Sequence, residues 1–75
     1  MTTVVDARGL RCPLPVIRLA AVARGAAPGT VITVLATDPA ARHDVPAWCR
    51  MREQEYAGEE LAEDGVPRYL VRRLT

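Results

Sequence analysis

The chain has 75 residues, 49% of them hydrophobic and 25% charged, with a formal net charge of +1. This length predicts a single domain over residues 1–75, and the near-neutral charge argues against a surface built to bind nucleic acids. No stretch approaches the ~18 apolar residues of a membrane span, and the N-terminus lacks the basic start and long apolar run of a signal peptide. We therefore expect a monomeric cytoplasmic protein that contacts neither a membrane nor nucleic acid.

The first half of the chain predicts a strand, a helix and a second strand. Residues 2–6 form a short β-rich run. The helix is expected from residue 13 to about residue 24, with Gly25 as its C-cap. Residues 30–37 are nearly all β-branched or apolar, which predicts a central strand covered on at least one face.

The second helix has a clear start and an apparent interruption. Asp38 followed by Pro39 is typical of a cap and a first helical residue. The helical pattern continues to about Glu55 but contains Pro46, which removes a backbone hydrogen bond. We therefore expect a break near Asp44, which would cap a second helical piece.

The C-terminal part predicts a β-hairpin. We expect a strand over residues 59–63 with Gly58 marking its entry, a turn at Asp64-Gly65, and a last strand over residues 68–74. The element order β-α-β-α-β-β predicts a two-layer α/β sandwich, with a four-stranded mixed sheet and two helices on one face.

The main candidate for chemistry is Cys12, which stands before Pro13 at the expected start of the first helix. Proline favours the first helical position, so Cys12 would be the N-cap, at the positive end of the helix dipole. Arg11 lies beside it, and these conditions lower a thiol pKa. Gly9 would allow the loop to approach closely, and Pro13 and Pro15 would fix the backbone.

Other residues have simpler interpretations. Cys49, beside Trp48 in an apolar stretch, is as well explained by the core as by chemistry. His43 is expected on a solvated helix face. One histidine and two cysteines at unrelated spacings make a poor metal site, so we expect no metal and no organic cofactor.

A possible docking surface surrounds the expected position of Cys12. Arg8, Arg11 and Arg18 could form a basic rim that attracts acidic partner surfaces, or simply a solvated face. Leu14 could make an exposed apolar contact beside the thiol, although single exposed apolar residues are normal.

Taken together, these landmarks resemble the TusA family of sulfur carriers, also called the SirA-like family, and the resemblance extends from Asp6 to Arg73. The shared motifs are Asp6-x-x-Gly9-Leu10-x-Cys12-Pro13-x-Pro15, Asp38-Pro39, Asp44-Val45-Pro46-x-Trp48-Cys49, Asp64-Gly65 and Tyr69-Leu70-Val71-Arg72. Two features depart from the family pattern: residues 54–63 are slightly longer than its usual third strand, and Leu14 stands where some relatives carry a charge.

The resemblance implies a sulfurtransferase in which Cys12 holds a sulfane sulfur as a persulfide. It further implies a donor of the cysteine desulfurase or rhodanese-like type and an acceptor protein in a sulfur relay. That relay would serve transfer RNA thiolation, molybdenum-cofactor synthesis or sulfur oxidation. The alternative is a non-catalytic interaction or regulatory module that docks through the same loop and helix end.

Overall fold

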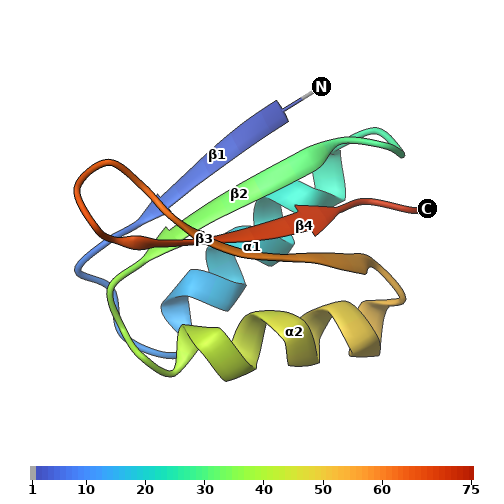
Figure 1. Cartoon of the computed structure of the whole chain (residues 1–75). Helices are drawn as coiled ribbons and strands as arrows, with labels where there is room; N and C mark the ends of the chain where they lie inside the picture. The colour runs from blue at the N-terminus through green and yellow to red at the C-terminus, as the bar shows by residue number, and fades with distance from the viewer. Residues whose placement is uncertain (1) are drawn as a thin grey trace.

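The computed structural model describes residues 2–75 as two helices packed on one face of a four-stranded sheet (Figure 1). The elements are β1 (Thr2–Ala7), α1 (Leu14–Gly25), β2 (Val31–Ala36), α2 (Ala41–Arg52), β3 (Glu55–Leu61) and β4 (Pro67–Arg72). The strand order is β1-β2-β4-β3, with β1 parallel to β2 and both other pairs antiparallel. The predicted two-layer sandwich with a mixed sheet is confirmed. Within residues 2–75, no helix is long and apolar enough to cross a membrane.

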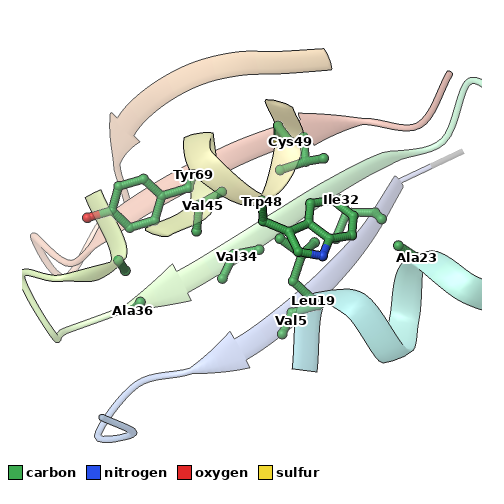
Figure 2. Packing of buried hydrophobic residues seen from close by; sticks show 12 residues of the cluster. Val5, Leu19, Ala23, Ile32, Val34, Ala36, Val45, Trp48, Cys49 and Tyr69 are labelled. Atoms are coloured by element: carbon green, nitrogen blue, oxygen red, sulfur yellow. The ribbon is translucent and has the colours of Figure 1, made fainter. Parts of the chain in front are cut away.

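The core lies between the sheet and the helices (Figure 2). Successive strand residues point to opposite faces, so Ile32 and Val34 of β2 share the face that the helices cover. Leu19 of α1 is fully buried against them, and Tyr69 of β4 is 1% exposed. Strand β2 lies between β1 and β4, and this central position agrees with its having the strongest β signal in the sequence.

Helix α2 is continuous, so the predicted break near Asp44 is wrong. Pro46 lies inside the helix and removes the hydrogen bond that its N–H would donate to the carbonyl of Arg42. Val45 and Trp48, on either side of the proline, are both buried in the core. Burial of the apolar face compensates for the lost bond, because tertiary packing rather than propensity supplies most helical stability.

Strand β3 begins at Glu55, earlier than predicted, and Gly58 lies within it rather than at its entry. The register against β4 shifts between Tyr56 and Gly58, which is a β-bulge. Gly58 has a φ of +123°, a conformation that glycine adopts without strain. The bulge therefore lets the strand continue through a residue that a sequence pattern interprets as a boundary. The hairpin turn at Asp64-Gly65 is where the sequence predicts it, between β3 and β4.

Core burial leads to a matched pair of stability predictions. Ile32 is fully buried and Ile17 is 54% exposed. The substitution Ile32→Val should lower the free energy of unfolding by about 0.5–1.5 kcal/mol. The same change at Ile17 should alter it by less than about 0.5 kcal/mol. Urea denaturation followed by circular dichroism measures both values, and equal effects would contradict the described core.

Candidate functional site

Cys12 lies on the loop between β1 and α1, at the end of the sheet where β2 also leads into its helix (Figure 1). Because β1 and β2 are parallel neighbours, their carboxyl ends meet at the same edge and bring both β–α loops together. Gly9, with a φ of +80°, donates its N–H to Thr37 Oγ1 at 2.9 Å. The Cys12 loop is thus hydrogen-bonded to the segment that follows β2.

The carboxylate of Asp38 joins the two loops more directly. Its Oδ2 accepts the backbone N–H of Cys12 at 2.8 Å, and its Oδ1 accepts the N–H of Ala40 at 3.0 Å. The sequence predicts Asp38 as the cap of the second helix, but that helix begins at Ala41 with Ala40 as its N-cap. Asp38 instead stabilises the turn before the helix. Its bond to Cys12 has no sequence signal, because 26 residues separate the partners.

The expected N-cap role of Cys12 is wrong, because the cap position is occupied by Pro13. The Pro13 carbonyl accepts the N–H of Ile17 at 3.0 Å, which is the first hydrogen bond of α1. Pro15, which is buried, stands at the second helical position, where its missing N–H would have no helical partner anyway. The peptide bond between Cys12 and Pro13 is cis. Because Pro13 is the cap residue, Cys12 precedes the helix rather than capping it.

The charged groups that reach the Cys12 thiol are carboxylates. Hydrogen bonding to Asp44 raises the pKa of Cys12 above its usual value, and desolvation, followed by the negative charges of Asp44 and Asp38, adds to this effect. The predicted lowering of this pKa is therefore wrong: Cys12 is not the N-cap of the helix, and acidic side chains act on its thiol. The charge of Arg11 contributes instead to lowering the pKa of Asp38.

Arg8 is engaged by carboxylates of its own. Its guanidinium donates to both oxygens of Asp6, at 2.9 and 2.7 Å, and to Oδ2 of Asp64 at 2.7 Å. These contacts lower the pKa of Asp6 to about 2, and the charge of Arg18 adds to that effect. Arg8 and Arg18 thus act on Asp6 at the end of β1, and their expected part in partner docking stays a prediction.

The thiol opens into a groove of about 240 Å³ between the two helices. Apart from Cys12 and Asp44 the groove is lined by apolar residues, namely Pro13, Val16, Ala47, Trp48 and Met51. Met51 is 73% exposed, and Leu14 and Ile17 of α1 are also exposed. An exposed cysteine therefore lies beside an apolar surface that a partner protein can cover.

Asp44 is the site residue that sequence reasoning missed. It lies in the first turn of α2 and lines the same groove as Cys12. The sequence assigns it to a helix cap because of Pro46, which follows two residues later. The one sequence signal for Asp44 is the motif Asp44-Val45-Pro46-x-Trp48-Cys49. Its spacing places Asp44 four residues before the core residue Trp48 and therefore near the same face of the helix.

The second cysteine has a different environment. Cys49 is 1% exposed in the core, and burial raises the pKa of its thiol to about 11. A buried thiol of this kind is inert as a nucleophile at neutral pH. Across residues 2–75, no cluster of three or more histidine, cysteine or carboxylate side chains could hold a metal ion.

Comparison with known proteins agrees with this geometry. The family model described as Sulfurtransferase TusA matches residues 3–73. The chain belongs to the TusA family. A solved structure, the SirA-like protein from Desulfitobacterium hafniense, aligns over 100% of both chains, with 26% identity and a TM-score of 0.79. Membership identifies the chain as a sulfurtransferase of the sulfur-carrier type and implies protein partners that give and receive the sulfur.

The carboxylate beside the thiol leads to a testable result. Asp44→Asn removes the negative charge that favours the protonated thiol and replaces a charged hydrogen-bond acceptor by a neutral one, so the Cys12 pKa should fall. The ultraviolet absorbance of the thiolate, followed against pH in a Cys49→Ala background, measures this pKa. Glu63→Gln, which makes the same charge change in the exposed β3–β4 turn, is the control. An unchanged pKa in Asp44→Asn, or an equal shift in Glu63→Gln, would contradict the assignment.

Proposed function

We propose that this protein carries sulfane sulfur as a persulfide on Cys12, between a donor protein and an acceptor protein. The observation that carries the proposal is the position of Cys12, exposed at the mouth of the groove between the helices, in a chain of the TusA family. Cys49 is unsuited to the role because it is buried. The chain offers partner proteins an open apolar surface around the thiol rather than an enclosed substrate pocket.

Loading is a thiol exchange that needs no oxidant. The Cys12 sulfur attacks the outer sulfur of a donor persulfide, and the sulfur–sulfur bond of the donor breaks. The bonding electrons go to the inner donor sulfur, which leaves as a thiolate and takes up the proton that Cys12 loses. A donor persulfide and a Cys12 thiol thus become a donor thiol and a Cys12 persulfide. Delivery repeats the exchange with the acceptor cysteine as the attacking group.

The carboxylates near Cys12 favour partners that bring positive charge. The rate of exchange follows the thiolate fraction, and Asp44 and Asp38 lower that fraction in the free protein. A lysine or arginine of the partner placed against Asp44 would offset the negative charge and favour the thiolate. Supporting roles belong to the residues that shape the loop and hold the thiol at the surface, namely Gly9, Arg11, Pro13 and Pro15.

The donor is of the cysteine desulfurase or rhodanese-like class, and the acceptor belongs to a sulfur relay. The pathways this relay could serve are transfer RNA thiolation, molybdenum-cofactor synthesis and sulfur oxidation, and a cytoplasmic location stays a prediction. A non-catalytic docking module is the alternative, since the groove beside Cys12 could bind a partner without sulfur chemistry.

Mass spectrometry of the intact protein separates these two functions. After incubation with a cysteine desulfurase and cysteine, the wild type should gain the mass of one or more sulfur atoms, which a reductant removes. Cys12→Ser should gain none, and Cys49→Ala should load like the wild type because its thiol is buried. Loading that persists in Cys12→Ser would show that Cys12 is not the residue that carries the sulfur. The docking module would be favoured if neither a cysteine desulfurase nor a rhodanese-like donor loads the wild type, while Cys12→Ser still binds a partner.

A further inference from the structure

A second concave site lies at the opposite end of the helix pair from Cys12. It is a cavity of about 310 Å³ whose lining includes three arginines, Arg24, Arg52 and Arg73. Arg24 lies in the last turn of α1, Arg52 in the last turn of α2, and Arg73 directly after β4. Both helices end on the side of the molecule where the C-terminus lies (Figure 1). Three separate parts of the chain therefore contribute an arginine to the lining of one cavity.

The charge of these arginines is not balanced by aspartate or glutamate side chains. Among residues 2–75, the ion pairs formed by arginine involve Arg8, Arg42, Arg68 and Arg72, and none involves the three that line the cavity. The remaining lining residues are Ala20, Ala23, Trp48 and Gln54, so no acidic side chain faces the cavity. Arg73 donates its Nε to the Thr75 carbonyl oxygen at 2.5 Å, which leaves both Nη groups for a ligand.

Hydrogen bonds hold the backbone around this cavity in place. Gln54 donates to the carbonyl of Arg52 at 2.9 Å and accepts the N–H of Leu74 at 2.6 Å. Arg73 donates its N–H to the Thr30 carbonyl at 2.9 Å, and its own carbonyl accepts the N–H of Gly29. Gln54 thus links the end of α2 to the segment after β4, and two of the three arginines have fixed backbone positions before any ligand binds.

From this arrangement we propose that the cavity binds a tetrahedral oxyanion, namely a phosphate group. Guanidinium groups donate pairs of parallel hydrogen bonds to such groups, and three of them match an anion with several oxygens better than a single carboxylate. The volume lies at the lower end of small-ligand pockets, which span roughly 300–1,000 Å³. The phosphate is either free or part of a small molecule whose remainder contacts Trp48, which also lines the cavity. The site is independent of the sulfur chemistry at Cys12.

Titration of the isotope-labelled protein with inorganic phosphate, followed by amide and indole NMR signals, tests the proposal. Saturable shifts should appear at the cavity residues and at the Trp48 indole. Arg52→Gln should weaken binding about tenfold or more, because it removes a charge-assisted bond. Arg50→Gln makes the same charge change on the same helix outside the cavity and should leave binding unchanged. Arg24→Gln provides a second variant should the first perturb the end of α2.

Adenosine 5′-monophosphate in parallel identifies the source of the phosphate group. Tighter binding than inorganic phosphate would assign the group to a larger molecule, and equal binding would assign it to the free ion. Two results would overturn the site: shifts that chloride reproduces at equal ionic strength, or equal weakening by Arg50→Gln and Arg52→Gln. Cys12→Ser should bind phosphate like the wild type, so this outcome does not depend on the carrier function.

Discussion

The geometry of the thiol depends on the carboxylate of Asp38, which joins the two β–α loops at Cys12 and adds to the bond between Gly9 and Thr37. Parallel pairing of β1 with β2 brings the loops to the same edge of the sheet. Asp38 then accepts one hydrogen bond from Cys12 and one from Ala40, so a single side chain sets the distance between the thiol loop and the start of α2. Asp44 lies in the first turn of that helix. The Asp38 bonds and the packing of α2 on the sheet together place Asp44 near the thiol.

This geometry gives an exposed thiol in an acidic environment. A thiol that stays protonated is a poor nucleophile, and it is also slow to oxidise, because both reactions proceed through the thiolate. For a carrier, that combination suppresses reactions with the wrong sulfur or oxidant while the protein is free. A partner that neutralises Asp44 would then restore reactivity only in the complex. Specificity can thus arise from charge at the thiol as well as from the apolar surface of Leu14, Ile17 and Met51.

The fold could be predicted largely from the sequence, and the site only in part. The apolar run of β2 and the Asp64-Gly65 turn have local signals that determine strand and hairpin. Local rules failed at Pro46, where burial of the flanking helix face outweighs the missing hydrogen bond. They failed again at Cys12, whose environment is set by Asp38 and Asp44. Contacts between residues so far apart in the chain depend on how the loops meet, and no local pattern encodes that.

The buried Trp48 connects the two ends of the helix face. It lines both the groove beside Cys12 and the arginine cavity, while Asp44 and Arg52 stand one helical turn or more on either side of it. Arg52 lies eight positions after Asp44, which is about 12 Å along the helix. Both helices point their C-terminal ends at the cavity, where arginines also interact favourably with the helix dipoles. Stability alone therefore accounts for Arg24 and Arg52 at helix ends. It does not account for Arg73, which follows a strand and faces the same cavity.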